Sequence, residues 1–440
     1  MASALFIPQE LWCLILDNLR DDEVAVAACA VTCRALRYAA EAHRWRTVSC
    51  PRLDLLPQLQ WTLRRTPNIA AKVQRLSIRL NFSGLVWITA FPNLQALTLS
   101  GVHFDAKPTL RDIVEPLSQS YLTRPVTSVV TLSLRECSLN ISTFLWLLQI
   151  MPNLTVLNLS EDTLIGPDPR SASFDIHLKL ANVSCRPKRL RWSLSQAGQG
   201  GSFLQSRICS AVEEAVFTFA SYQGHSEVST GTSIPKVTIF QRAARKSLKT
   251  LAILLPHSLL FGVPFDMLKE LEELYFPRPQ NSYLTSFHIG LNGAITDYQT
   301  DTLPTVLAQI PPALAALTRV DIHCMLMRSQ EDTQPTRVRL AEELARLLHQ
   351  HPSLVVTFHV RGYSERDAEY MRACLAKSLV VRSCPELKSE SERLRFIHDV
   401  ADPEAHVWED GWHKADTASS IPLFQAQHDA EMASCGRGPG

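Results

Sequence analysis

"FPNLQALTLS" (residues 91–100) returns as "MPNLTVLNLS" at residues 151–160, and looser copies begin at residue 310 ("IPPALAALTRVDI") and residue 351 ("HPSLVVTFHV"). Proline stops a preceding helix because it has no N–H group and disfavours the helical conformation in the residue before it. Asn or Ser then favours a turn, and the alternating apolar residues that follow predict a short strand with one buried face. The repeated phrase therefore predicts a unit of helix, turn and strand.

The helices that should precede two of these turns can also be read in the sequence. One runs through "RLAEELARLLHQHP" and ends before Pro352. Its apolar face is formed by four leucines at helical spacing: Leu340, Leu344, Leu347 and Leu348. The other, "STFLWLLQIMP", has a candidate N-cap at Ser142 and ends before Pro152. Both helices support the repeating unit.

Further strands recur at uneven intervals without the proline. They are centred on Leu76, Leu132, Leu251 and Leu274, and weaker ones lie in "KRLRWSL" from residue 188 and "EEAVFTF" from residue 213. Such units cannot bury their apolar face alone, so stacking them predicts a parallel sheet with helices outside it, in a curved solenoid. They resemble leucine-rich repeats, whose period is roughly 20–29 residues. The resemblance is to the architecture, because the period is irregular and the Asn that usually closes each strand is missing.

These patterns predict an α/β fold with three regions after the N-terminal helices. The leucine-rich-repeat-like solenoid spans residues 55–362, with its parallel strands on the concave side and its helices outside. The segment "YSERDAEYMRACLAKSL" carries a capping box at Ser364 and Asp367, so we expect a helical cap over residues 363–412. Residues 413–440 are polar and small, and we expect a disordered tail there.

The N-terminal stretch "IPQELWCLILDNL" (residues 7–19) predicts a short helix that is apolar on more than one side. Leu11, Ile15 and Leu19 form one stripe, and Trp12 and Leu16 form a second stripe beside it. Two more short helices should follow, one through Val24, Ala27, Ala28 and Val31 and one through Leu36, Tyr38 and Ala39. Because a unit of about 40 residues rarely buries enough surface to be stable alone, some of these side chains must rest against the rest of the chain or a partner.

The order of residues in this region closely resembles the F-box motif. Ile7-Pro8-x-Glu10-Leu11 is followed by Ile15-Leu16-x-x-Leu19, an acidic turn and "VAACAVTCRALRYAA". The resemblance covers residues 5–47, with departures at Ile7, Thr32 and Leu36. It implies docking onto the Skp adaptor, which joins a cullin and a RING subunit. The residues that would make this contact are Ile7, Pro8, Glu10, Leu11, Ile15, Leu16, Leu19 and Val24.

The same resemblance implies that the repeats hold a protein to be ubiquitinated. Members of this class act by positioning a substrate lysine near a charged ubiquitin carrier, without catalysis of their own. The residues between buried strand positions should point to the concave face and contact the target. These candidates are Thr98, Ser100, Ser133, Arg135, Asn158, Ser160, Tyr275, Asp321 and His323.

Composition argues against several other classes of function. With 44 Lys and Arg against 43 Asp and Glu, the 440-residue chain has a net charge of +1, which does not favour nucleic-acid binding. The eleven cysteines show no CxxC spacing, so we expect reduced thiols, no metal site and no cofactor. The sequence lacks a recognisable signal peptide and an uninterrupted apolar run of roughly 18 residues, so we expect a soluble protein of the cytoplasm or nucleus with no membrane contact.

Two alternatives remain open at this point. An enzyme is disfavoured because the acidic clusters at Glu213–Glu214 and 270–273 accompany no recognised catalytic motif. His349 and His351 lie at a helix end, where His favours the helix dipole more often than a metal. A non-catalytic leucine-rich-repeat scaffold, whose N-terminal helices merely cap the solenoid, is the closer rival to the adaptor.

Overall fold

The computed structural model places the chain in two compact units, Met1–Pro187 (unit 1) and Lys188–Gly440 (unit 2). The residues that the structure describes are 8–19, 22–32, 34–79, 88, 90–102, 125–160, 163–166, 183–194, 207–219, 234–255, 283–294, 302–312, 314–325, 334–361, 387, 390, 392–399 and 421–422. The two units are described separately below.

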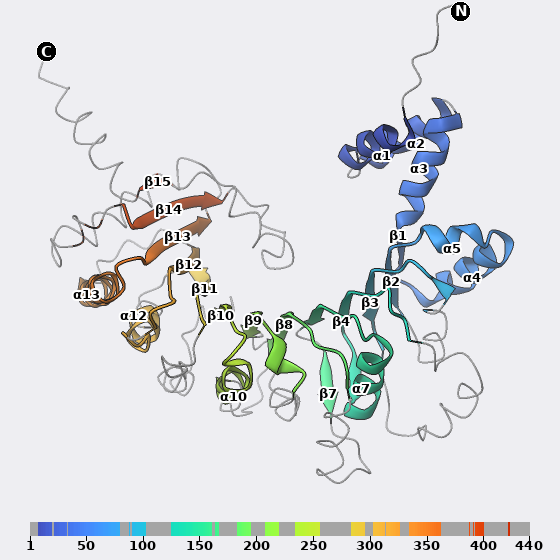
Figure 1. Ribbon diagram of the computed structural model, residues 1–440. Helices are drawn as coiled ribbons and strands as arrows, with labels where there is room; N and C mark the ends of the chain where they lie inside the picture. Colours follow the sequence, from blue (N-terminus) through green and yellow to red (C-terminus); the bar gives the residue numbers. More distant parts are fainter. Residues whose placement is uncertain are drawn as a thin grey trace, which may run out of the picture. The chain divides into compact units, whose positions relative to one another are not determined.

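Unit 1 begins with three helices and continues into strands and short helices (Figure 1). The N-terminal helices are α1 (Gln9–Asn18), α2 (Glu23–Thr32) and α3 (Arg34–Arg46). The later helices are η1 (Leu53–Leu55), α4 (Leu56–Arg65), α5 (Asn68–Lys72) and α7 (Ile141–Ile150). The strands are β1 (Thr47–Cys50), β2 (Arg75–Arg79), β3 (Ala96–Ser100), β4 (Thr131–Arg135), β5 (Ser138–Asn140), β6 (Val156–Leu159) and β7 (Leu164–Gly166).

The main sheet of unit 1 is parallel. Its strands follow the order β1-β2-β3-β4-β6, and β5 pairs with β7 in a separate two-stranded sheet. Leu76, Leu97, Leu132 and Leu157 are in register across four of these strands, and all four are buried. Since successive side chains of a strand point to opposite faces, this leucine row marks the apolar face of the sheet, and the residues between the leucines lie on its second face.

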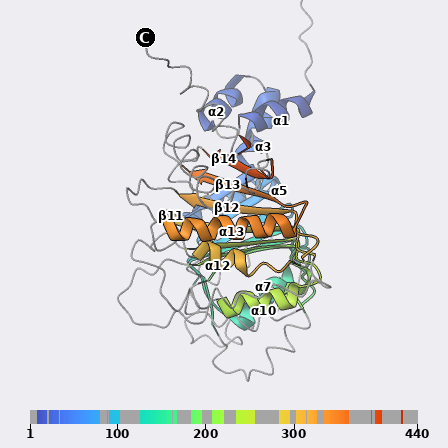
Figure 2. The ribbon, with the colours of Figure 1, turned by 90° about the vertical axis from the view of Figure 1, so that its left-hand side faces the viewer.

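Unit 2 alternates strands and helices. Its helices are η3 (Cys209–Ala211), α10 (Ile234–Ala244), α12 (Thr302–Ala308) and α13 (Gln334–Gln350). Its strands are β8 (Arg189–Leu194), β9 (Glu214–Phe219), β10 (Thr250–Leu255), β11 (Ser286–Ala294), β12 (Arg319–Met325), β13 (Val355–Arg361), β14 (Leu394–Asp399) and β15 (Ile421–Pro422). Figures 1 and 2 show α12 and α13 on one side of these strands.

Strands β8 to β14 pair in parallel in chain order, and β15 pairs antiparallel with β14. A buried row again marks the apolar face: Leu190, Ala215, Leu251, Phe287, Val320, Val356 and Leu394. In the described residues the main pairings therefore comprise five parallel strands in unit 1 and seven in unit 2. The expected α/β class with parallel strands is confirmed, and the sheet is not closed.

The backbone repeats one arrangement where several of the strands begin. The N–H groups of Thr155 and Val156 both donate to the carbonyl of Val130 on the neighbouring strand, at 2.9 and 3.0 Å. In the same way, Lys249 and Thr250 both donate to Glu213. In the repeated phrase, the Asn93 side chain donates to the carbonyl of the previous unit at Ala71 (2.7 Å), and Asn153 does so at Thr127 (2.8 Å). The asparagine thus joins consecutive units as well as forming the turn.

Backbone N–H and carbonyl groups at several helix ends form hydrogen bonds with side chains from outside the helix. The N-cap of α7 is Asn140, whose Oδ1 accepts the N–H of Thr143 at 2.8 Å, so the predicted cap at Ser142 is two residues too late. Arg346 of α13 donates to the carbonyl of Leu307 at 2.8 Å, near the end of α12. Arg393 donates in the same way to Leu348 in the last turn of α13. Each arginine supplies donors to carbonyls that a helix end leaves without an intrahelical partner.

Three expectations for the later part of the chain differ from the structure or lie outside it. Within the predicted helical cap (363–412), β14 adds a parallel strand to the sheet. Within the predicted tail (413–440), β15 pairs with β14. The strand expected around Leu274 lies outside the described residues. The segment "LRFIHD" of β14 was missed because it was interpreted as part of a helical region.

Candidate interaction surfaces

The three N-terminal helices share a small apolar core. Its buried members are Leu16, Val26, Ala39 and Ala40. Trp12 and Leu19 pack against this core from α1. At the start of α2, Asp22 Oδ1 accepts the N–H of Ala25 at 2.9 Å, which satisfies one of the donors that a helix start leaves open. These contacts hold α1 and α2 against α3.

Apolar side chains on the remaining sides of α1 and α2 are exposed. On α1 they are Leu11, Leu14 and Ile15, at positions i, i+3 and i+4. On α2 they are Val24, Ala27, Ala28 and Val31, which share one helical side. Val24 is 80% exposed and Val31 is 82% exposed. We call these two sets the apolar stripes, and they present aliphatic surface to solvent.

The structure separates the predicted F-box contacts into three groups. Pro8, Leu11, Ile15 and Val24 are exposed, whereas Ile7 and the side chain of Glu10 lie outside the described residues. Leu16 is fully buried in the helical core, so its prediction as a surface contact is corrected, whereas Leu19 is partly buried against that core and stays a candidate. Leu14 and Val31 were missed as candidates. Their exposure depends on which side of each helix faces the core, and a helix that is apolar all round does not reveal this in its sequence.

A row of small polar side chains crosses the second face of unit 1. In register they are Ser49, Ser77, Thr98, Ser133 and Asn158. All five are at least partly exposed, in contrast to the buried leucines beside them. Asn158 Nδ2 donates to the Ser133 hydroxyl at 3.0 Å. We call this set the polar row.

A second register line on the same face carries positive charge. Arg79, Ser100 and Arg135 are in register, and Ser160 follows the end of β6. Both arginines are exposed, and Arg79 Nη2 lies 3.6 Å from the Glu136 carboxylate. The structure therefore brings six of the predicted target contacts together on one face: Thr98, Ser100, Ser133, Arg135, Asn158 and Ser160. Tyr275 lies outside the described residues.

The second face of unit 2 is buried along much of β10 to β13 and contains a charged cluster there. Asp321 is fully buried, and its Oδ2 lies 3.0 Å from His288 Nδ1 and 2.5 Å from Arg319 Nε. Its Oδ1 lies 3.0 Å from His359 Nε2. The ring of His323 stacks on that of His359 with centroids 4.2 Å apart. We call this set the Asp321 cluster, and it spans β11, β12 and β13.

Burial and pairing set the charge states of this cluster. Burial alone would raise the pKa of the Asp321 carboxyl, but the contacts with His288 and His359 hold its pKa well below the ordinary value. Burial lowers the pKa of His288, and Asp321 opposes this only in part. At neutral pH the cluster therefore contains an ionised Asp321 beside a neutral His288, with Arg319 as the permanent cation.

The location of Asp321 corrects its prediction as a target contact. The residue lies on the predicted face, but a fully buried carboxylate is not available to a partner. Its role is to balance charge within the sheet, which the sequence did not reveal because His288 belongs to a strand that was not predicted. His323 is partly exposed and stays a candidate. No group of three or more His, Cys, Asp or Glu side chains in the described ranges is arranged to bind a metal ion.

Five cysteines with described side chains are reduced and form no disulfide. Cys50, Cys137, Cys185 and Cys209 are buried, and Cys29 is partly buried. Burial raises the pKa of Cys185 to about 12, so this thiol stays protonated at neutral pH. These positions pack as small apolar residues and show no feature of a reactive site.

No protein-family model matches the chain, and no curated protein matches it. Among the described helices, none combines the length and the apolar character that a membrane span requires.

Proposed function

We propose that this chain is the substrate-recognition adaptor of a Skp–cullin–F-box ubiquitin ligase. In this proposal α1 and α2 bind the Skp adaptor, and the repeat units bind a target protein. The ligase would act by raising the effective concentration of a target lysine near the ubiquitin carrier, with no chemistry by the adaptor itself.

The apolar stripes carry the proposal. Burying an aliphatic side chain is worth about 1.5–3 kcal/mol, so a set of exposed aliphatic side chains on each of two helices that pack on α3 favours a partner. The rival scaffold, in which the helices cap the solenoid, would require these side chains to face the sheet. Instead, the contact between the helices and the following elements is made by α3, through β1 and α5. The stripes suit packing against a hydrophobic groove.

The second face of unit 1 is the proposed target surface. Ser, Thr and Asn side chains of the polar row can each donate and accept hydrogen bonds, and their small size lets a partner backbone approach closely. Arg79 and Arg135 add charge beside the row, and arginine is enriched in protein interfaces. This combination fits a polar segment of a target protein.

A binding titration of purified Skp adaptor with the full chain tests the proposal. The decisive variant combines Val24→Asp with Val31→Asp, because both positions are exposed and the core of the helices is left intact. We expect wild type to bind and the variant to lose roughly a hundredfold in affinity, as expected when two anchors of an interface are made charged.

The matched control combines Trp61→Asp with Val130→Asp, which are exposed apolar positions elsewhere in unit 1. It should bind as tightly as wild type. Absence of binding by wild type, together with a Val24/Val31 variant that melts earlier than the control, would support the scaffold instead.

A further inference from the structure

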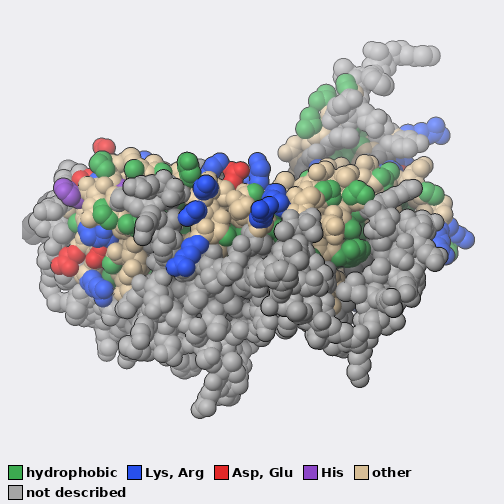
Figure 3. Space-filling view, turned by 60° about the horizontal axis from the view of Figure 1, so that its bottom comes forward, with side chains coloured by type: hydrophobic (Ala, Val, Ile, Leu, Met, Phe, Trp, Pro, Cys, Tyr) green, Lys and Arg blue, Asp and Glu red, His purple; other side chains and the backbone are tan. Residues whose placement is uncertain are grey.

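Unit 2 carries a dense set of exposed basic side chains where β8, β9 and β10 begin. They are Lys188, Arg189, Arg207, Arg242, Arg245, Lys246 and Lys249. In the described residues from β8 to β10, the acidic side chains are Glu213 and Glu214 alone. We call this surface the basic edge. Figure 3 shows Lys and Arg side chains gathered in one region of the face in view.

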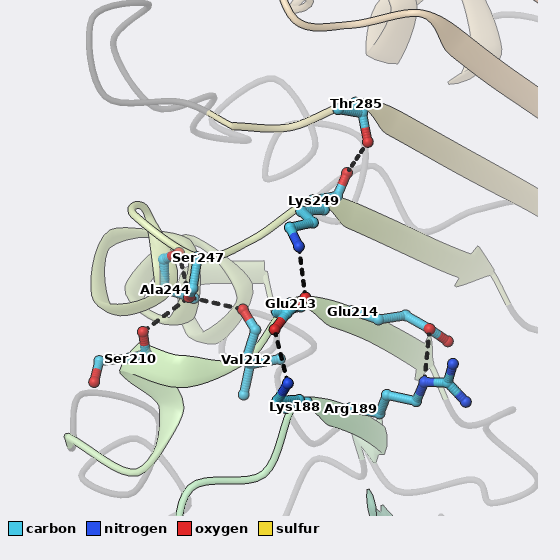
Figure 4. A network of polar contacts seen from close by, with 10 residues as sticks. All are labelled: Lys188, Arg189, Ser210, Val212, Glu213, Glu214, Ala244, Ser247, Lys249 and Thr285. Atoms are coloured by element: carbon cyan, nitrogen blue, oxygen red, sulfur yellow. Dashed lines mark hydrogen bonds and ion pairs between the residues drawn. The ribbon is translucent and has the colours of Figure 1, made fainter. Parts of the chain in front are cut away.

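Hydrogen bonds hold the segments of the basic edge together (Figure 4). The N–H of Glu213 donates to the carbonyl of Lys188 at 2.7 Å, and the N–H of Lys249 donates to that of Glu213 at 2.7 Å. The Ser247 hydroxyl lies 2.8 Å from the carbonyls of both Ser210 and Val212. The turn after α10 therefore packs on the turn before β9, and basic residues that are distant in the sequence share one surface.

The two glutamates fix the position of neighbouring cations. Lys249 Nζ lies 2.7 Å from one carboxylate oxygen of Glu213, and Lys188 Nζ lies 3.5 Å from the other. The hydrogen bond from Lys249 lowers the pKa of Glu213, so this carboxylate is ionised at neutral pH. Arg189 Nε lies 3.2 Å from Glu214. Because an ammonium has three donors and a guanidinium has five, these pairs position the cations and leave them further donors.

Helix capping accounts for only part of the basic edge. Arg242 lies in the last turn of α10, and Arg245 and Lys246 follow that helix, where cations favour the helix dipole. Lys188 and Lys249 belong to other elements, and the same explanation does not extend to them. The density of charge is a property of the surface and not of one helix.

An exposed aromatic residue lies beside the basic edge. Tyr283 is 60% exposed and comes two residues before Thr285, whose N–H donates to the carbonyl of Lys249 at 2.8 Å. Tyrosine and arginine are the residue types that most often anchor protein interfaces. The net charge of the chain, +1, does not favour a long nucleic acid.

We propose that the basic edge binds an acidic segment of a partner protein, with Tyr283 as an apolar anchor at its end. Lys188 and Lys249 are separated by one strand, so their backbones are about 10 Å apart, and their long side chains can reach carboxylates that recur about every 7 Å on one face of an extended chain. The inference goes beyond the ubiquitin-ligase proposal and does not depend on the helices α1 and α2.

The test is fluorescence anisotropy of the full chain with a labelled peptide in which glutamate alternates with serine. The variant combines Arg245→Glu with Lys246→Glu, both fully outside the sheet. The matched control combines Arg64→Glu with Arg339→Glu, which are exposed positions elsewhere and change the net charge equally. We expect the peptide to bind wild type and the control alike, with affinity that falls as salt rises, and the Arg245/Lys246 variant to lose roughly tenfold or more.

Three results would overturn the proposal. The first is no binding of the peptide at low salt. The second is an equal loss in both variants, which would indicate attraction to the whole chain. The third is tighter binding of a single-stranded oligonucleotide or of vesicles containing phosphatidylserine, lost in the same variant, which would assign the surface to another class of partner. Circular dichroism spectra of both variants establish that they are folded.

Discussion

The second faces of the two units differ although their backbones repeat the same arrangement. In unit 1 this face carries the polar row, whose small side chains are partly exposed. In unit 2 it carries buried residues, including Val216, Ala252 and Leu254, and the fully buried Asp321. A polar group that is buried must find partners inside the protein, whereas an exposed one is free to serve a partner protein. One repeat architecture therefore leaves polar side chains accessible in unit 1 and buries them in unit 2.

The largest expected effect is the difference in stability between two variants, each of which lacks one polar side chain of one face. Asp321→Ala removes a fully buried carboxylate that contacts the buried His288 and His359, and losing a buried hydrogen-bond partner of this kind costs about 1–3 kcal/mol of the free energy of unfolding. Asn158→Ala in the polar row should cost about 1 kcal/mol or less. Urea denaturation measures the loss, and hydrogen exchange of peptides covering β11 to β13 assigns it to unit 2. If Asp321→Ala and Asn158→Ala lowered the free energy of unfolding equally, the two faces would not differ in their contribution to stability.

Acidification should lower the stability of unit 2, because the Asp321 cluster contains ionisable groups. It should not change the contribution of the polar row. The folded-state pKa of His288 is below its ordinary value, so the unfolded chain takes up a proton first, and stability falls as pH drops below about 6.5. The pKa of Asp321 is also lowered, so its contribution is complete above about pH 4 and is lost as pH falls further. No residue of the polar row is ionisable. Denaturation midpoints between about pH 7.5 and about pH 5 test this window.

His288→Gln serves as the control for the pH experiment. It should lower stability at neutral pH, since the contact with Asp321 is lost, but it should flatten the dependence on pH between neutrality and about pH 5. If the stability of this variant depends on pH as strongly as that of wild type, the titrating group is a residue other than His288.

A substitution within the polar row should have the smallest effect on stability. Ser77→Arg adds a long side chain to a partly exposed position, so the free energy of unfolding should change by less than about 0.5 kcal/mol. The same change should block a protein that binds across this face. The measurement is the recovery of cross-linked target from cells, with recovered Skp adaptor as the internal standard and Gln58→Arg on α4 as the control. If the variant recovered neither the target nor the Skp adaptor, the claim that the two partners bind separate surfaces would be contradicted.

The sequence predicted the parallel strands because their pattern is local. In "FPNLQALTLS", proline, asparagine and alternating leucines each act within a few residues, and β3 lies where they predict it. Strand β11 was missed because "SFHIGLNGA" interrupts the apolar alternation with His, Gly and Asn. The burial of Asp321 was equally hidden, since it depends on His359, 38 residues away in the sequence. Tertiary pairing of this kind leaves no local pattern.

The sequence of the N-terminal helices likewise did not reveal which of their side chains are buried. The segment of α2, "EVAVAACAVT", is apolar almost throughout, so its periodicity does not reveal which side faces the core. The structure buries Val26 and exposes Val24 and Val31. Three short helices lie where the sequence predicted them, but Leu16 was assigned to the surface because a motif records spacing and not the packing of α1 against α3.

Hydrogen–deuterium exchange of the full chain, with and without saturating Skp adaptor, tests the central claim most directly. The proposal predicts slower exchange in peptides covering α1 and α2, where the apolar stripes would be buried by the adaptor, and unchanged exchange in β2, β3 and β4. Unchanged exchange throughout the chain, or protection of the sheet strands while α1 and α2 exchange as before, would contradict it.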